Sequence, residues 1–366
     1  AQSKTLLIVS GGIEAADAAR RAKQMGHTVV VSDRDPHAPG FAFADSCLIA
    51  DVYGPAETAA AAERYNRKIR KIDGVLCVAA DAPVTAATVA QRLRLPGLPL
   101  HVAELACDKL AMKKAFRSAG VAAPWFAEVA TPQELQRIAI ARGRDLVIKP
   151  VDSRGSRGVQ RVAQVADLTA AFMLARSHSP SERVMVEQYL PGPQISTESI
   201  VMDGVCYTPG FSDRNYEYLD RYAPFFIEKG GDLPSHLPAD IQDKVKELVG
   251  RAASALGVTC GTVKGDIVVH DGEPYVIELA ARLSGGFFCT REIPLNTGVD
   301  FIGAAIRLAL GETVLPDELI PRQQTAVVQR YAFPQPGTVT KISGEDEARK
   351  IPGIAEVVVT ARPGDV

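Results

Sequence analysis

The stretch Thr5-Leu-Leu-Ile-Val-Ser-Gly-Gly12 is an apolar, β-branched run that ends at a pair of glycines. Such a run is typical of a buried strand, and the glycines mark the turn that follows it. Residues 13–26 are compatible with a helix, and residues 28–32 form a second apolar run that ends at Asp33. The order strand, helix, strand predicts a parallel pair, because parallel neighbours need a long crossover connection.

The same alternation continues to about residue 100. Residues 56–71 are predicted to form a helix and residues 74–80 a strand, which is followed by Asp81. The breaker-rich segment Leu95-Pro-Gly-Leu-Pro-Leu100 then closes this part of the chain. We therefore expect an α/β domain over residues 1–100, built on a doubly wound parallel sheet that binds ligands at the carboxyl ends of its strands.

Beyond residue 100 the pattern changes from α/β to α+β. Asp108 can cap a helix, and residues 132–142 and 145–149 predict a helix and a strand. Residues 263–270 and 275–279 flank a short turn sequence that contains Asp-Gly. This arrangement predicts an antiparallel hairpin in the middle of the chain.

Composition indicates a folded globular protein and excludes several classes of partner. Of the 366 residues, 46% are hydrophobic and 23% are charged, and the formal net charge is -2. Such a balance gives no general attraction to nucleic acid or to anionic lipid. No apolar run approaches the ~20 residues that a membrane helix needs, and the first residues lack the pattern of a secretory signal. We expect a cytoplasmic protein whose partners are small molecules, not nucleic acid or membrane.

Several familiar catalytic signatures are missing from the sequence. It contains no GxxxxGK(S/T) phosphate loop, no GxSxG turn and no HExxH motif, and its six cysteines are too far apart for a zinc site. The glycine pair Gly11-Gly12 with Asp33 and Asp35 resembles a dinucleotide fold, but the GxGxxG pattern is not satisfied. A nicotinamide-dependent oxidoreductase therefore stays open as an alternative.

A lysine before a glycine-containing loop is a candidate phosphate site. Lys149 lies in the apolar run Val147-Ile-Lys-Pro150, which precedes the loop Asp152-Ser-Arg-Gly-Ser-Arg-Gly-Val159. An ammonium group and several backbone N–H groups can surround a polyphosphate in such a loop. Arg154 and Arg157 strengthen the prediction of an anion site. An ordinary solvated turn is the alternative.

Three carboxylates complete the set of candidates. Glu187 ends a predicted strand over residues 183–189, where a carboxylate and backbone groups could contact an adenine edge. Asp266 and Glu278 lie on the two arms of the predicted hairpin. Carboxylates that converge across paired strands offer the oxygen ligands that Mg²⁺ prefers. Solvated surface charges are the alternative for all three.

Taken in order along the chain, these residues resemble the motifs of the ATP-grasp superfamily. The match is closest to members allied with carbamoyl-phosphate synthetase, the purine-pathway carboxylate ligases and the L-amino acid ligases. The resemblance spans nearly the whole chain and implies that residues 1–100 are a pre-ATP-grasp domain. It also implies a two-lobed ATP-grasp domain over residues 101–320, with a lid subdomain at about 124–187, and a short C-terminal lobe over residues 321–366.

The resemblance implies roles for individual residues as well. Asp266 and Glu278 match the metal carboxylates of the family. Lys264 and Arg282 match its basic residues that stabilise charge on the transferred phosphoryl group. The residues implied to bind ATP are Lys109, Lys149, Ser153, Gly155, Ser156, Gly158, Glu187, Gln188, Tyr189, Leu190 and Gln194.

Three departures from the family pattern bear on these roles. Gln194 stands where a ribose-binding glutamate is usual, although an amide can still bond to hydroxyls. The usual Glu-x-Asn-x-Arg is Glu278-Leu-Ala-Ala-Arg282 here, and Ala280 cannot bind a metal, so one Mg²⁺ is expected to bind more weakly or to keep an extra water. The chain stops just after Pro363-Gly-Asp365, so we expect the C-terminal lobe to lack its last strands.

The activity that the resemblance implies is ATP-dependent joining of a carboxylate to an amine through an acyl phosphate, with release of ADP and phosphate. ATP and Mg²⁺ are the implied cofactors, with Mn²⁺ as an alternative ion, and relatives suggest a homodimer. The carboxylate could be an amino acid or another small acid. Arg214 or Arg221 is a candidate clamp for a substrate carboxylate, and Ser284-Gly-Gly286 could donate backbone hydrogen bonds to the reacting group. A nucleotide-binding protein without turnover is the main alternative.

Overall fold

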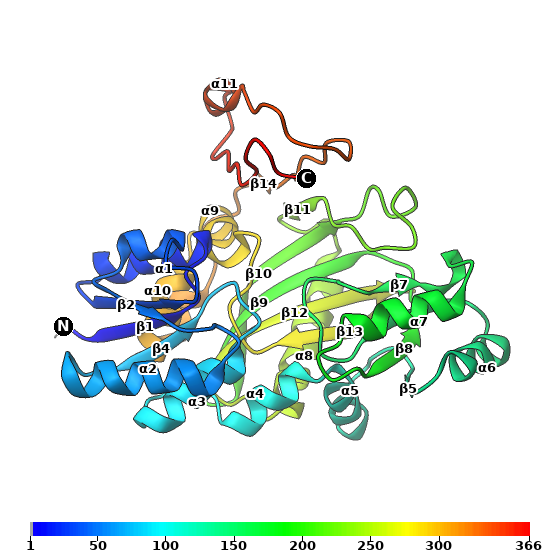
Figure 1. Ribbon diagram of the computed structural model, residues 1–366, viewed down its shortest axis with the longest axis horizontal. Helices are drawn as coiled ribbons and strands as arrows, with labels where there is room; N and C mark the ends of the chain where they lie inside the picture. Colours follow the sequence, from blue (N-terminus) through cyan, green and yellow to red (C-terminus); the bar gives the residue numbers. More distant parts are fainter. Residues whose placement is uncertain (1–2) are drawn as a thin grey trace. The chain divides into compact units, whose positions relative to one another are not determined.

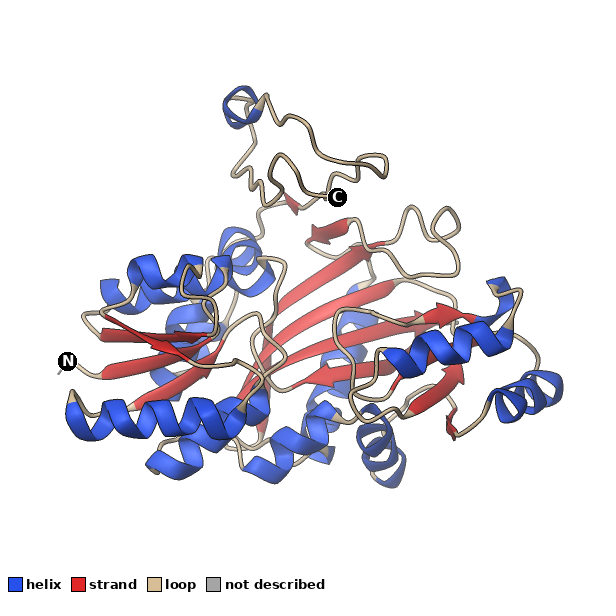
Figure 2. Ribbon diagram, viewed as in Figure 1, coloured by secondary structure: helices blue, strands red, loops and turns tan. Residues whose placement is uncertain are grey.

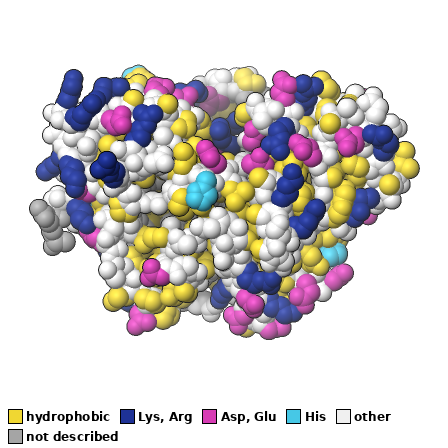
Figure 3. Space-filling view, turned by 90° about the horizontal axis from the view of Figure 1, so that it is seen from below, with side chains coloured by type: hydrophobic (Ala, Val, Ile, Leu, Met, Phe, Trp, Pro, Cys, Tyr) yellow, Lys and Arg dark blue, Asp and Glu magenta, His cyan; other side chains and the backbone are white. Residues whose placement is uncertain are grey.

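The computed structural model describes residues 3–366 of the chain. It contains two compact units, one up to Gln329 and one over Arg330–Val366, which are described separately below. Helices and strands alternate at the start of the first unit, and consecutive strands form a large sheet in its middle (Figure 2). No helix within residues 3–366 is both long and apolar enough to cross a membrane. Basic and acidic side chains are interspersed on the face shown in Figure 3.

The first unit begins with a four-stranded parallel sheet, as predicted (Figure 1). Its strands and the helices on its faces are β1 (Thr5–Val9), α1 (Ile13–Gln24), β2 (Thr28–Asp33), β3 (Ser46–Ile49), α2 (Pro55–Lys68), β4 (Gly74–Cys77), α3 (Pro83–Leu93) and α10 (Phe301–Ala309). The strand order is β3-β2-β1-β4. Alternate residues of a strand point to opposite faces, so Leu6 and Ile8 pack with α1 and α10, while Leu7 and Val9 pack with α2 and α3.

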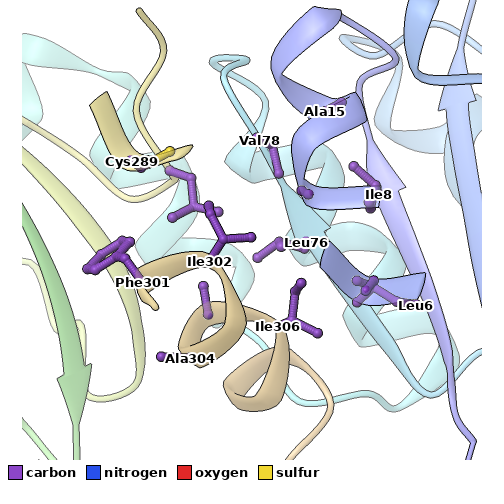
Figure 4. Packing of buried hydrophobic residues seen from close by; sticks show 14 of the residues in the cluster. Leu6, Ile8, Ala15, Leu76, Val78, Cys289, Phe301, Ile302, Ala304 and Ile306 are labelled. Carbon is purple, nitrogen blue, oxygen red and sulfur yellow. The ribbon is translucent and has the colours of Figure 1, made fainter. Parts of the chain in front are cut away.

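Helix α10, near the end of the first unit, packs against the sheet at its beginning. Ile302 and Ile306 of this helix share one buried cluster with Leu76 of β4 (Figure 4). Gly74 allows the close approach, because a Cβ at this position would lie 2.5 Å from the carbonyl oxygen of Ala309. Residues from both ends of the unit therefore form a single core.

The middle of the first unit is a six-stranded sheet that places the hairpin of the site. Its strands are β9 (Gln194–Met202), β10 (Val205–Asn215), β11 (Gly230–Leu233), β12 (Gly261–His270), β13 (Glu273–Ala280) and β14 (Val327–Val328), in the order β13-β12-β9-β10-β11-β14. The predicted hairpin is confirmed, with Asp271 and Gly272 at positive φ in its two-residue turn. The helices α4 (Leu100–Cys107), α5 (Lys109–Ser118) and α8 (Ala239–Ala255) contribute to the core on one face of this sheet. Lys264 and Asp266 line a cavity on the other face.

A smaller antiparallel sheet has a core of its own. It consists of β5 (Phe126–Val129), β6 (Leu146–Pro150), β7 (Gln160–Arg161) and β8 (Val184–Gln188), with α6 (Pro132–Arg142) and α7 (Leu168–Ser177). Leu135, Ile148, Phe172 and Val186 are among its buried residues. The predicted helix and strand at 132–149 are thus present, and the lid boundaries at about 124–187 stay a prediction.

Short helical elements occupy several connections of the first unit. They are η1 (Pro39–Phe43), η2 (Val162–Gln164), η3 (Phe288–Glu292), α9 (Ile293–Thr297) and η4 (Pro316–Leu319). The second unit contains the helix α11 (Glu345–Arg349) and is otherwise irregular. Short strand-like pieces in the sequence from about residue 324 predict strands there, and this prediction is wrong apart from β14. Strand propensity forms a strand only where a neighbouring strand can pair with it. In this unit Val339 exchanges backbone hydrogen bonds with the turn at Gly364 and Asp365.

Candidate active site

A cavity of about 230 Å³ lies between the central sheet and the smaller sheet. Its walls come from α5, β6, the 152–158 loop, β8, the linker after β8, β10 and the β12–β13 hairpin. Of the predicted site residues, Gly158 is not part of the wall. Those that line the cavity are Lys109, Lys149, Ser153, Gly155, Ser156, Glu187, Gln188, Tyr189, Leu190, Gln194, Lys264, Asp266, Glu278 and Arg282.

Strand pairing brings the two hairpin carboxylates together. Asp266 of β12 lies directly opposite Glu278 of β13 in the ladder, and both line the cavity. Asp266 accepts a hydrogen bond of 2.8 Å from Arg214 and contacts Lys264. Burial alone would raise the pKa of Asp266, but these two cations outweigh burial and hold that pKa well below its usual range. Asp266 is therefore ionised, as a metal ligand must be.

The donor set fits a magnesium ion that is shared with a nucleotide. No group of three or more His, Cys, Asp and Glu side chains within residues 3–366 could hold a metal by protein ligands alone. Mg²⁺ is commonly bound by one or two carboxylates, with phosphate oxygens and water as its other ligands. Asp266 and Glu278 supply that number of carboxylates, and Glu278 keeps 31% of its side chain exposed.

Glu187 lies between two lysines under the cavity. Its carboxylate is 2.8 Å from the Nζ of Lys113 and also contacts Lys149. Burial opposes ionisation of Glu187, but both lysines favour it and lower its pKa below the usual value. The sequence analysis did not identify Lys113. The sequence spacing could have identified Lys113, because it follows Lys109 by four positions and so lies on the same helix face.

The 152–158 loop closes one side of the cavity. Its carbonyl at Ser153 accepts a 2.7 Å hydrogen bond from the Nζ of Lys109. Gly155 and Gly158 both have positive φ, and a Cβ at Gly158 would also lie 3.1 Å from Pro150. The positive φ at position 158 favours glycine, and a larger residue there would also crowd Pro150.

The linker after β8, residues 188–190, lines another part of the cavity. Gln188 and Tyr189 donate their backbone N–H groups to the carbonyls of Trp125 and Asp145, at 2.8 and 2.9 Å. The Tyr189 ring lies 6.2 Å from the ring of Phe226, which also lines the cavity. Two aromatic rings beside a row of backbone groups suit a planar base, and the adenine contacts expected here stay a prediction.

Arg282 is oriented by a residue of the N-terminal sheet. Its Nε donates a 2.7 Å hydrogen bond to Oδ1 of Asp81, and its Nη2 reaches the same oxygen. Burial would lower the pKa of Arg282, but the nearby Asp81 outweighs burial and raises it above its usual value. The sequence analysis placed Asp81 at the end of a strand without giving it a role.

Two expectations about substrate contacts stay predictions. Arg214 lines the cavity, and its guanidinium is bound by Asp266 at 2.8 Å and by Glu228 at 2.6 Å. Arg221 is exposed and is absent from the cavity wall.

The backbone of the 284–286 turn is also engaged. Ser284 donates its N–H to Glu198 at 3.0 Å, and Gly286 donates to Glu14 at 2.9 Å. These donors are turned toward protein carboxylates, which the glycine-rich sequence alone did not predict. Glu198 is fully buried, and this burial raises its pKa to about 7.

Comparison with known proteins agrees with this geometry. Residues 106–286 match the ATP-grasp domain, and residues 330–366 match the L-amino acid ligase C-terminal domain 2. The chain is 30% identical to the uncharacterized protein y4rH of Sinorhizobium fredii, over 82% of this chain and 62% of that protein. It is 32% identical to a D-alanine--D-alanine ligase of Gloeobacter violaceus, over 50% of this chain and 63% of the ligase. The chain thus spans less than two thirds of the length of these relatives.

Solved structures share the fold. The L-amino acid ligase from Bacillus licheniformis matches 100% of this chain and 89% of its own, with a TM-score of 0.84 and 23% identity. The phosphoribosylglycinamide synthetase from Anaerococcus prevotii covers 100% of this chain and 90% of its own, with a TM-score of 0.74 and 20% identity. The sequence matches, the shared fold and the arrangement of lysines, loop and hairpin carboxylates agree. Residues 106–286 of this chain therefore belong to the ATP-grasp domain family.

Proposed function

We propose that this protein is an ATP-dependent ligase that joins the carboxylate of one small molecule to the amine of another and releases ADP and phosphate. One observation carries the proposal. Cations that suit a triphosphate and carboxylates that suit Mg²⁺ line a single cavity in an ATP-grasp domain. The proposed mechanism uses no Ser or Cys nucleophile. The lysines, the arginine and the carboxylates of the cavity suit catalysis by positioning the substrates and stabilising the charge on the transferred phosphoryl group.

The proposal assigns each group a place along a bound ATP. The linker at residues 188–190 would hold the adenine, and Gln194 the ribose. Lys109, Lys149 and the 152–158 loop would hold the phosphates, and Lys264 and Arg282 would stabilise the transferred phosphoryl group. Asp266 and Glu278 would hold Mg²⁺, which neutralises phosphate charge when it is bound.

The reaction has two steps. An oxygen of the substrate carboxylate attacks the γ-phosphorus, the bond from that phosphorus to the β-phosphate oxygen breaks, and ADP leaves. The lone pair of the amine then attacks the acyl carbon, the carbon–oxygen bond to phosphate breaks, and the amine loses a proton. The 152–158 loop would exclude water from the acyl phosphate between these steps.

We further propose that both substrates are amino acids, which makes the product a dipeptide. The match of residues 330–366 to the L-amino acid ligase C-terminal domain 2 supports this choice over other carboxylates. A homodimer, with no nucleic acid or membrane partner, is part of the same proposal. The domain boundaries expected from the sequence also stay proposals.

The test is Mg²⁺-dependent release of ADP from ATP in the presence of pooled L-amino acids. We expect one pool to stimulate release in the wild type, and Lys149→Ala and Glu278→Ala each to abolish it. The variant Lys244→Ala serves as the matched control, because Lys244 forms a surface ion pair with Glu273 at the far end of the hairpin. Binding of ATP without ADP release from any pool would instead support a nucleotide binder without turnover.

A further inference from the structure

Asp81 lies at the meeting point of the N-terminal sheet and the cavity. It follows β4, at the carboxyl end of that parallel sheet, and it lines the cavity together with Arg282. One oxygen, Oδ1, accepts from both Nε and Nη2 of the guanidinium. Two donors on one acceptor fix the plane and the rotamer of a side chain that otherwise has many conformations.

Backbone contacts set the distance between the two residues. Val78 and Leu283 form a parallel bridge, and Ala79 donates its N–H to the carbonyl of Leu283 at 3.3 Å. The segment after β13 is therefore attached to the end of β4. Ser10 strengthens this junction, because its hydroxyl donates to the Val78 carbonyl at 3.1 Å.

The source of the carboxylate distinguishes Arg282 from other cations of the cavity. Lys149 contacts Glu187, and Lys264 contacts Asp266, so the partners of both lysines belong to the ATP-grasp domain itself. Arg282 takes its partner from the N-terminal sheet, across the junction described above. A shift at this junction would change the direction of its guanidinium.

We propose that Asp81 is a positioning residue that holds Arg282 in the orientation in which it meets the γ-phosphoryl group, so that the N-terminal sheet completes the reaction site. This inference rests on the proposed function. Asp81 acts through Arg282 and contacts neither substrate. Its loss therefore has an effect only while Arg282 is present, as expected for residues that act as a unit.

The test measures nucleotide affinity by isothermal titration in the presence of Mg²⁺. The probes are ADP and the non-hydrolysable β,γ-imido analogue of ATP, and the difference between them reports on the γ-phosphoryl group. We expect Asp81→Ala to bind the analogue about 10-fold more weakly with ADP affinity unchanged, since misplacement of a contact by ~1 Å has effects of this order or larger. In Arg282→Lys, adding Asp81→Ala should change nothing further.

The matched control is Asp17→Ala. Asp17 also binds an arginine across the same two parts of the chain, with Nε of Arg291 at 2.8 Å, but neither residue lines the cavity. We expect its analogue affinity to equal that of the wild type. Thermal melting checks that the variants fold. If Asp81→Ala does not fold, the isosteric variant Asp81→Asn replaces it in the titrations.

Two results would overturn the inference. One is an analogue affinity in Asp81→Ala equal to that of the wild type. The other is a further loss when Asp81→Ala is added to Arg282→Lys, which would show that Asp81 contacts a ligand directly. Turnover is measured separately, and there we expect kcat to fall about 100-fold in Asp81→Ala. A wild type that releases no ADP would contradict the proposed function, while the titrations would still decide the role of Asp81.

Discussion

Lys113 is a charged residue in a buried position. Its side chain is 1% exposed, and it lies 2.8 Å from the carboxylate of Glu187. Burial lowers the pKa of Lys113, and Glu187 opposes that effect. Lys113 was not identified from the sequence, although its spacing of four positions puts it on the helix face of Lys109. The sequence could not show that the two lysines differ in burial, because burial depends on strands β8 and β13 from elsewhere in the chain.

Removing this lysine should destabilise the protein strongly. We expect Lys113→Met to lower the free energy of unfolding by about 3 kcal/mol, because it leaves Glu187 buried with one partner fewer. Urea denaturation measures the change. The double variant Lys113→Met/Glu187→Gln should recover part of the loss, since no unpaired carboxylate remains. A loss that is equal in the single and double variants would show that packing, not charge, dominates at this position.

Glu198 should make stability depend on pH. Its pKa is about 7 in the folded protein against 4.5 ordinarily, so the folded state holds its proton more tightly than the unfolded chain does. The resulting stabilisation is complete below pH 4.5 and is lost as the pH rises through 7. Glu198→Gln stays neutral, so we expect it to match the wild type near pH 4.5 and to exceed its unfolding free energy at pH 8 by up to about 3 kcal/mol.

The measurement is urea denaturation of both proteins across that pH range. Glu292, whose pKa burial raises to about 8, is present in both and cancels in the difference. A difference in unfolding free energy that does not change with pH would contradict the account of Glu198.

At the scale of elements, the N-terminus of helix α5 places a residue of the site, and local sequence determines where this helix begins. Its N-cap, Asp108, accepts a 2.8 Å hydrogen bond from the N–H of Ala111, and the next residue is Lys109 of the cavity wall. The cap was predictable because it depends on neighbouring residues. The strand order of the central sheet was not, since β9 pairs with β12 across some sixty residues, and nothing local in either strand specifies that partner.

Variants of two N-cap residues distinguish an effect on stability from an effect on ATP binding. We expect Asp108→Ala and Asp167→Ala each to lower the unfolding free energy by about 1 kcal/mol, because both remove an N-cap. Only Asp108→Ala should also raise the KM for ATP, by about 10-fold, since it displaces Lys109. Steady-state kinetics and denaturation test the pair. Equal KM values in the two variants would show that the cap does not position Lys109.

At the scale of the whole first unit, the buried hydrophobic residues form separate cores. One core combines the N-terminal sheet with α10, and another fills the smaller sheet around Leu135 and Ile148. Trp125 packs against the second core and is the single tryptophan of the chain. The sequence predicted the first sheet from local patterns, but of the smaller sheet it predicted only two separate strands, at residues 145–149 and 183–189. The return of α10 to the first sheet was not predicted, because it is a contact between the two ends of the unit.

This division predicts how the unit unfolds. Ile306→Ala leaves a cavity in the first core and should destabilise it by about 2 to 5 kcal/mol. We expect the main circular-dichroism transition to move to lower urea concentration, while the fluorescence transition of Trp125 stays in place. Equal shifts in both signals would show instead that the two cores unfold together.

The central claim is that a substrate carboxylate is phosphorylated by ATP and then captured by an amine. The most direct measurement uses an amino acid labelled with ¹⁸O in its carboxylate, with mass spectrometry of the phosphate released. The acyl-phosphate route predicts one labelled oxygen in each phosphate formed. Unlabelled phosphate alongside formation of the amide product would contradict the claim, because the carboxylate oxygen would then never have been bonded to phosphorus.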